Sequence, residues 1–125
     1  MRNFKYIIFF FSCLLIASCE RDYLKPKQFD PNTPVSFSQD VIPIFTENCT
    51  QAGCHNSGGE TPNLIPSKGY DQLLGLGYVD TTNAEASVLY LRMNSNYKSM
   101  PPIGKISNEK TGKILAWIKQ GAKNN

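Results

Sequence analysis

The sequence predicts a small all-α domain. Ile114, Trp117, Ile118 and Gly121 are spaced at i, i+3, i+4 and i+7, which places them along one buried stripe of a helix. Residues that cap helix N-termini precede other apolar segments, and no segment alternates between apolar and polar residues in the manner of a strand. The domain, residues 36–125, is so short that a core made of side chains alone would be marginally stable.

The first helix of the domain is expected to begin near Ser36. Ser36 and Gln39 have the spacing of a capping box, and apolar residues with helical spacing follow them. Pro43 cannot lie inside an unbroken helix. We therefore expect a short turn first and the main helix over residues 43–48.

Two further helices are expected in the middle of the domain. Residues 56–69 are rich in Gly, Pro and polar residues and predict a loop, which a short helix over residues 70–74 follows. Asn83 is a suitable N-cap and Glu85 would lie in the first turn. These residues predict a helix that continues to about Asn94.

The last helix is expected to follow a loop over residues 95–106, which contains two prolines and a glycine. Ser107 is its predicted N-cap. Gly121 is suited to end it, because glycine readily adopts the left-handed conformation found at helix C-termini.

The N-terminal segment, residues 1–18, has the features of a secretory signal peptide. Two basic residues precede an apolar run over residues 6–16, which is too short for a transmembrane helix. The small residues before Cys19 resemble the end of a bacterial lipoprotein signal, in which cleavage leaves this cysteine as the lipidated first residue. The alternative is an ordinary signal with an incidental cysteine. We expect a lipid-anchored protein of the bacterial cell envelope, with its domain outside the cytoplasm.

Residues 19–35 are expected to contain the lipidated cysteine and an extended linker. Residues 20–35 include three prolines and six charged residues and have little periodicity. Such a composition is typical of a spacer between a membrane and a domain.

Composition excludes several classes of function. The formal net charge of +3 is modest and the basic residues are scattered, which disfavours nucleic acid as a partner. The chain has one histidine, so it cannot by itself form a bis-His haem site, a His-rich zinc site or a two-His metal triad. Cys13 lies in the signal peptide and Cys19 is used by lipid. Cys49 and Cys54 are therefore the cysteines left for chemistry.

Residues 49–55 read Cys-Thr-Gln-Ala-Gly-Cys-His. Two thiols followed directly by an imidazole have the order required for c-type haem, in which each thiol forms a thioether with a haem vinyl group. His55 would then be the proximal iron ligand. The usual motif has two residues between the cysteines, and this chain has four. A structural zinc site would need four ligands, and a disulfide between Cys49 and Cys54 would leave His55 unexplained.

Several segments of the domain resemble class I cytochrome c. Phe45 lies four residues before Cys49, where the family has a buried aromatic residue, and residues 114–119 are similar to the family's last helix. Residues 61–64, Thr-Pro-Asn-Leu, are similar to the family's Gly-Pro-Asn-Leu. Residues 87–90, 99–102 and 117–122 resemble the small monohaem domains with a C-x4-C-H motif that are found in bacterial lipoproteins. The resemblance implies a helical domain wrapped around one covalently bound haem c.

The resemblance also implies which residues orient and complete the iron site. In the family, a proline carbonyl accepts a hydrogen bond from the proximal histidine, which would be Pro62 here, with Pro66 as the alternative. Met100, in Ser-Met-Pro-Pro, is the candidate distal iron ligand, and core packing is the alternative role.

Other residues near these positions are expected to serve packing or surface roles. Met93 and Trp117 are expected in the core. Tyr90, Arg92 and Tyr97 are candidates to reach a haem propionate, with surface or packing roles as the alternative.

We therefore expect a membrane-anchored, monomeric c-type cytochrome that passes single electrons between redox partner proteins and is not an enzyme. One alternative is a haem-based sensor or haem enzyme subunit with an open iron site. The other is a haem-free module with a disulfide between Cys49 and Cys54.

Overall fold

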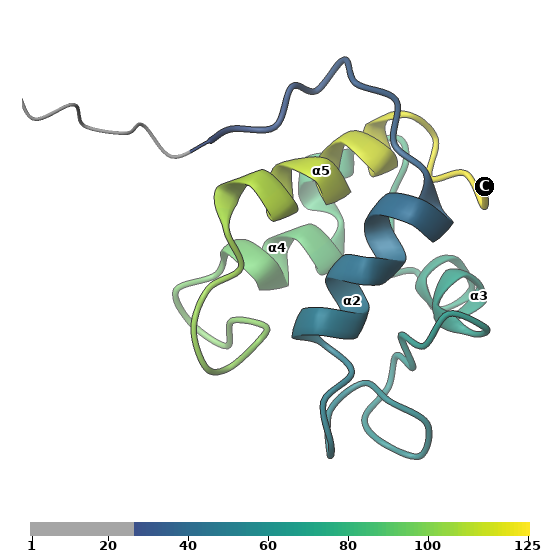
Figure 1. The fold of residues 1–125 in the computed structure, drawn as a ribbon, viewed down its shortest axis with the longest axis vertical. Coiled ribbons are helices and arrows are strands. Elements are labelled where there is room, and N and C mark those ends of the chain that lie inside the picture. Colours follow the sequence, from purple (N-terminus) through teal and green to yellow (C-terminus); the bar gives the residue numbers. More distant parts are fainter. Residues whose placement is uncertain (1–26) are drawn as a thin grey trace, which may run out of the picture.

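The computed structural model describes residues 27–125, so the predicted signal peptide and Cys19 lie outside the described residues. Within this range every regular element is helical, which confirms the all-α prediction. No helix in the described part of the chain is both long enough and apolar enough to span a membrane. The elements in chain order are the π-helix η2 (Phe37–Val41), α2 (Ile42–Asn48), α3 (Gly69–Gly75), the 3₁₀ helix η3 (Ala84–Ala86), α4 (Val88–Asn94) and α5 (Asn108–Lys119) (Figure 1).

The first helical segment begins with a cap at Ser36, as predicted. The N–H of Gln39 donates to Oγ of Ser36 at 3.2 Å, and the N–H of Ser36 donates to Oδ2 of Asp40 at 2.9 Å. The side chain of Asp40, not that of Gln39, thus completes the cap. The wide π turn precedes Pro43, which has no N–H to donate. The expected turn before the main helix is present, and the helix itself begins one residue earlier than predicted.

The last helix, α5, forms as its pattern predicts. The N–H of Lys110 donates to Oγ of Ser107 at 3.3 Å, which confirms the predicted cap. Ile114, Trp117 and Ile118 are fully buried. Gly121 follows with a φ of +93°, a conformation that glycine adopts without the strain of a side chain.

The region before α4 differs from the prediction. The helix expected from Asn83 to Asn94 is interrupted: Asn83 makes no side-chain cap, and a 3₁₀ turn ends at Ser87 before α4 begins. Oδ1 of Asp80 accepts the N–H groups of Thr82 at 2.8 Å and Asn83 at 3.1 Å, and Oγ of Ser87 accepts the N–H of Asp80 at 2.9 Å. This local network competes with a continuous helix. The short helix expected over residues 70–74 is present as α3.

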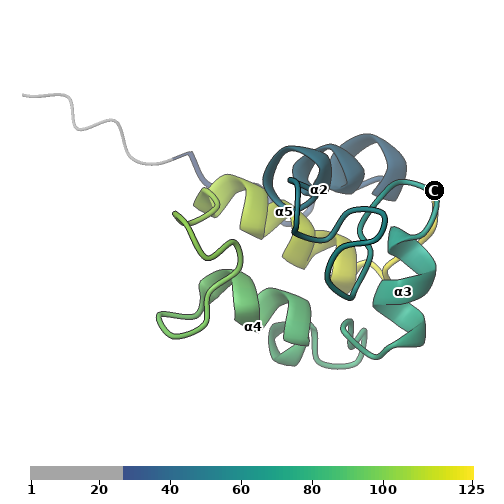
Figure 2. The same ribbon diagram turned by 90° about the horizontal axis from the view of Figure 1, so that it is seen from below.

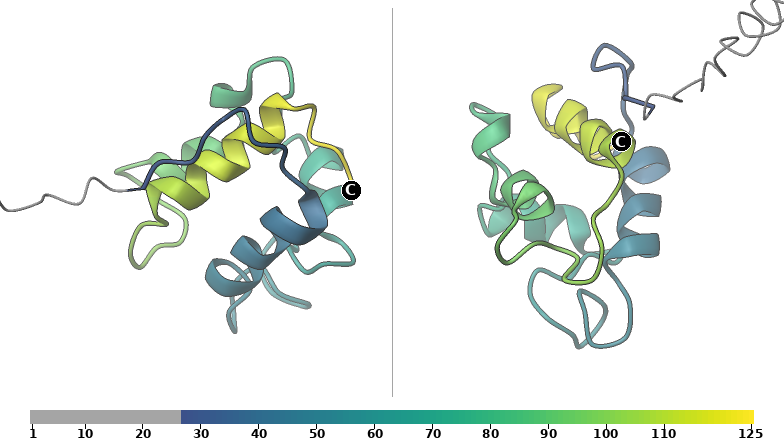
Figure 3. Two further views of the ribbon diagram at one scale, coloured as in Figure 1. Left: turned by 45° about the horizontal axis from the view of Figure 1, so that its top comes forward. Right: turned by 90° about the vertical axis from the view of Figure 1, so that its left-hand side faces the viewer.

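The core includes a group of aromatic rings around Phe37. Its centroid lies 5.1 Å from that of Trp117, 5.4 Å from that of Tyr70 and 6.5 Å from that of Phe45. Helix α5 packs against both η2 and α4. Figures 2 and 3 show that α2 and α4 lie on different sides of α5. Residues of the loops at 49–68 and 95–106 line the same cavities beside this core.

Candidate cofactor site

The segment that contains both cysteines is a compact turn held by backbone hydrogen bonds. Cys49 ends α2, where its N–H donates to the carbonyl of Phe45 at 2.7 Å. The N–H of His55 then donates to the carbonyl of Cys49 at 3.0 Å, which closes the loop between the two cysteines. Gly53 turns the chain inside this loop with a φ of +76°. The four-residue gap therefore forms a defined turn, and the two thiols and the imidazole extend from one short segment.

A second tight turn follows, and it depends on Gly59. A side-chain Cβ at this position would lie 1.9 Å from the carbonyl oxygen of Cys54. The next N–H, that of Glu60, donates to this same carbonyl at 2.8 Å. Glycine is thus required for the chain to approach Cys54 closely enough to form this bond. The composition of residues 56–69 predicts a loop but does not reveal this requirement.

Cys49 and Cys54 are both free thiols, and both are half-buried. Burial raises the pKa of Cys49 to about 11, and the neighbouring Cys54 contributes to this rise. Cys49 is therefore protonated at neutral pH. Among residues 27–125 no group of three or more His, Cys, Asp and Glu side chains could hold a metal ion. The structure thus offers no zinc site of the usual composition in this range.

His55 is oriented by carbonyl groups of the following loop. Its Nδ1 lies 2.8 Å from the carbonyl oxygen of Pro62 and 3.2 Å from that of Glu60. Because a carbonyl oxygen can only accept a hydrogen bond, Nδ1 must carry the proton. In the neutral ring this leaves the lone pair of Nε2 available for a metal. Pro62, and not the alternative Pro66, therefore provides the contact that the sequence resemblance implied.

Two cavities lie between the loops and helices that surround His55. The larger has a volume of about 420 Å³, within the range of about 300–1,000 Å³ typical of cofactor and ligand sites. The smaller measures about 290 Å³. Much of the larger cavity wall is apolar, formed by Leu64, Leu73, Val88, Leu89 and Met93. The cavities share five lining residues, Cys49, His55, Thr61, Met100 and Pro102.

Met100 belongs to both cavities and reaches them from the loop before α5. Its N–H donates to the carbonyl of Arg92 at 2.9 Å, which ties the loop to α4. Its side chain is 39% exposed, so it is not an ordinary core methionine. The fold therefore brings Met100 and His55 to the same cavities although they are distant in the sequence.

The remaining predicted residues divide between core, cavity and surface. Trp117 is fully buried and Met93 is buried, which confirms their packing roles, and Met93 also lines the larger cavity. Arg92 lines that cavity as well. Tyr90 packs against the core, whereas Tyr97 is 78% exposed and does not line either cavity.

Two residues of the cavity wall, Leu73 and Tyr78, were not singled out from the sequence. Each has the local pattern of an ordinary core residue. Nothing in their spacing distinguishes a wall from a packed interior. The Thr-Pro-Asn-Leu segment was the one local pattern that pointed to Leu64 and its neighbours.

The chain was compared with known proteins in three ways. No protein-family model, curated protein or solved structure matched it. The candidate site is therefore defined by the residues and contacts of this chain alone.

Proposed function

We propose that the protein is a monohaem c-type cytochrome, anchored to a bacterial membrane through lipid on Cys19, that passes single electrons between redox partner proteins. The observation that carries the proposal is the hydrogen bond between Nδ1 of His55 and the carbonyl of Pro62. It frees Nε2 of an imidazole that directly follows two free thiols and lines an apolar cavity. No other histidine exists in the chain.

The residues around the cavities fit the chemistry of a covalently bound haem. Cys49 and Cys54 are available as free thiols for two thioether bonds. Nε2 of His55 and the thioether of Met100 are nitrogen and sulfur donors that suit haem iron. The apolar side chains of Leu64, Leu73 and Val88 would contact the flat apolar faces of the macrocycle.

Each part of the chain has a distinct task in this proposal. Haem, when bound, supplies an iron that is reversibly oxidised and reduced by one electron. Pro62 holds the tautomer and orientation of His55, which keeps Nε2 directed away from the loop. Met100 would provide a soft ligand that favours reduced iron and raises the reduction potential. The apolar wall would limit contact between haem and water, and the absence of a second histidine from the sequence disfavours peroxidase chemistry.

The proposal is tested by the pyridine haemochrome spectrum of protein produced with haem-ligation machinery. We expect the spectrum of haem c and retention of haem after acid–acetone extraction, because both thioethers are covalent. The double variant Cys49→Ala, Cys54→Ala should lose the haem. Ala52→Ser, a change at an exposed position of the same loop, is the matched control and should keep it. Purified wild-type protein without haem, or with extractable haem, would reject the proposal, and oxidised thiols in such protein would favour the disulfide module.

A further inference from the structure

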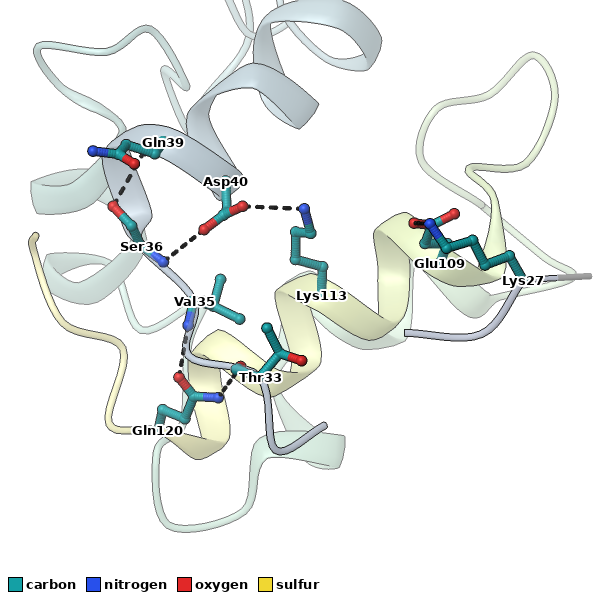
Figure 4. Close-up of polar contacts among 9 residues, drawn as sticks. All are labelled: Lys27, Thr33, Val35, Ser36, Gln39, Asp40, Glu109, Lys113 and Gln120. Atoms are coloured by element: carbon teal, nitrogen blue, oxygen red, sulfur yellow. Dashed lines mark hydrogen bonds and ion pairs between the residues drawn. The ribbon is translucent and has the colours of Figure 1, made fainter. Parts of the chain in front are cut away.

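Residues 27–35, here called the strap, are held against α5 by the side chain of Gln120 (Figure 4). Oε1 of Gln120 accepts the N–H of Val35 at 3.0 Å. Its Nε2 donates to the carbonyl of Thr33 at 2.9 Å and to that of Pro31 at 3.5 Å. One side chain thus satisfies backbone groups at three positions of a segment that has no regular structure of its own.

Further contacts continue along α5 to its N-terminal turn. Phe29 lies over Gly112, where an added Cβ would be 3.3 Å from the Cβ of Phe29. Nζ of Lys27 lies 3.3 Å from Oε1 of Glu109, in the first turn of α5. This ion pair is exposed and adds little stability, but it marks where the chain meets the domain. The strap is therefore packed along α5 from its C-terminal to its N-terminal end.

If Cys19 carries lipid, the packing of the strap against α5 leaves a short tether between the lipid anchor and the domain. Residues 20–26 then connect the anchor to the strap. Fully extended, this distance is at most about 28 Å, and a flexible chain of this length has a root-mean-square span of about 15 Å. A domain the size of residues 27–125 has a diameter of about 30 Å. At its typical span the tether keeps its entry point within about one domain radius of the bilayer, which favours orientations with this end of α5 on the membrane side.

The loop over residues 95–106 lies at this end, because α5 begins directly after it. It carries two of the most exposed large side chains of the described residues, Ile103 at 93% and Tyr97 at 78%. Lys98 and Lys105 add positive charge, and the loop sequence contains no acidic residue. Apolar and aromatic side chains beside lysines suit the interface of a bilayer with anionic headgroups.

We propose that the strap orients the domain so that the loop over residues 95–106 lies against the surface of the anchoring bilayer, with Tyr97 and Ile103 in contact with its interface. The inference rests on the lipid at Cys19 in the proposed function and is independent of haem. Because Met100 belongs to this loop, the Met100 side of the cavities faces the membrane. Redox partners would then approach along the membrane plane.

The test is amide hydrogen exchange of the lipidated protein on vesicles of phosphatidylcholine and phosphatidylglycerol. The comparison is a variant with about 30 Gly and Ser residues inserted after Tyr23, which lengthens the root-mean-square tether span to about 30 Å. We expect residues 95–107 to exchange more slowly in the wild type than in this variant. Residues 69–76, which include α3, should exchange equally in both. Equal exchange of residues 95–107, or slowing that also appears at α3, would overturn the proposal.

Side-chain variants distinguish the contribution of the loop to the slowed exchange from that of the strap. The double variant Tyr97→Ser, Ile103→Ser should lose the slowed exchange, and Leu76→Ser, which changes an exposed leucine next to α3, should keep it. Gln120→Ala should speed exchange in the strap and remove the slowing at residues 95–107. If circular dichroism shows that Gln120→Ala is unfolded, Phe29→Ala replaces it. A released strap with unchanged slowing of the loop would overturn the orienting role.

Haem and anchoring are measured on the same samples. Protein that lacks haem but shows the slowed loop would reject the cytochrome and support the present inference. Protein that does not float with vesicles would reject the lipid anchor, and this inference with it. Slowing that survives without the anchor would also overturn it, because the tether would then have no role.

Discussion

Replacement of Gly59 by alanine should destabilise the loop that orients His55. The added Cβ would lie 1.9 Å from the carbonyl oxygen of Cys54 and 2.6 Å from Oδ1 of Asn56, where real Cβ atoms stay beyond 3.0 Å. The Asn56 side chain can rotate away, but the Cys54 carbonyl belongs to the backbone. The chain must therefore shift by about 1 Å, which weakens the hydrogen bond from the N–H of Glu60 to that carbonyl.

Overpacking of this kind typically costs about 1–3 kcal/mol. For a domain of this size, that corresponds to a decrease in melting temperature of about 5–20 °C. The carbonyl of Glu60 also lies 3.2 Å from Nδ1 of His55, so the shift disturbs the orientation of the imidazole. We expect Gly59→Ala to have both a lower melting temperature and a lower yield of attached haem.

The assay is thermal unfolding followed by circular dichroism, together with the ratio of haem absorbance to protein. Gly75→Ala is the matched control, because its Cβ would meet nothing within 4 Å and its backbone φ is not in the left-handed region. This control should be unchanged or stabilised by up to about 1 kcal/mol, since alanine restricts the unfolded chain. A Gly59→Ala protein that melts with the wild type and binds haem equally would refute the reasoning.

Three further outcomes are expected. Met100→Ala should keep covalent haem but lose the sulfur-to-iron charge-transfer band and have a lower reduction potential, as measured by redox titration; an unchanged band would exclude Met100 as a ligand. The hydrogen bond from the N–H of Ser36, with help from Lys113, holds the pKa of Asp40 below its ordinary value of 3.8. The wild type should therefore be more stable than Asp40→Asn above this pH and lose that advantage as the pH falls through the lowered pKa. Because the Asp40 side chain is 31% exposed and partly screened by solvent, the difference should be at most about 1 kcal/mol in urea unfolding. Protein made without haem-ligation machinery should have less helix by circular dichroism than the holo protein, and equal helix content with a cooperative melt would show that haem is not part of the core.

Features encoded by neighbouring residues were predictable from the sequence. The caps at Ser36 and Ser107 and the stripe on α5 depend on residues within a few positions of one another, and the structure confirms them. The contact between His55 and Pro62 spans seven residues and was implied by the short Thr-Pro-Asn-Leu segment. Such short-range patterns leave little freedom to the chain.

Features set by competing or distant contacts were not predictable. Asn83 has the residue type of an N-cap, but the carboxylate of Asp80 takes the local N–H groups and Ser87 turns back to Asp80. Gln120 contacts the strap at Val35, 85 residues earlier, and no local pattern of an extended segment reveals such a partner. The composition of the strap is that of a spacer, yet its backbone groups are satisfied by α5.

Helix α4 faces the larger cavity on one side and the cavity beneath the strap on the other. Leu89 and Met93 line the larger cavity, while Tyr90 and Asn94 line a third cavity of about 320 Å³ beneath the strap. A helix of seven residues is too short to be stable alone, so its position depends on what packs against both sides. On one side this is α5 with the strap. The other side of α4 faces the larger cavity, which side chains do not fill. A bound haem would supply apolar contacts there. A small domain has few core residues, and the candidate site therefore lies where α4 lacks apolar contacts.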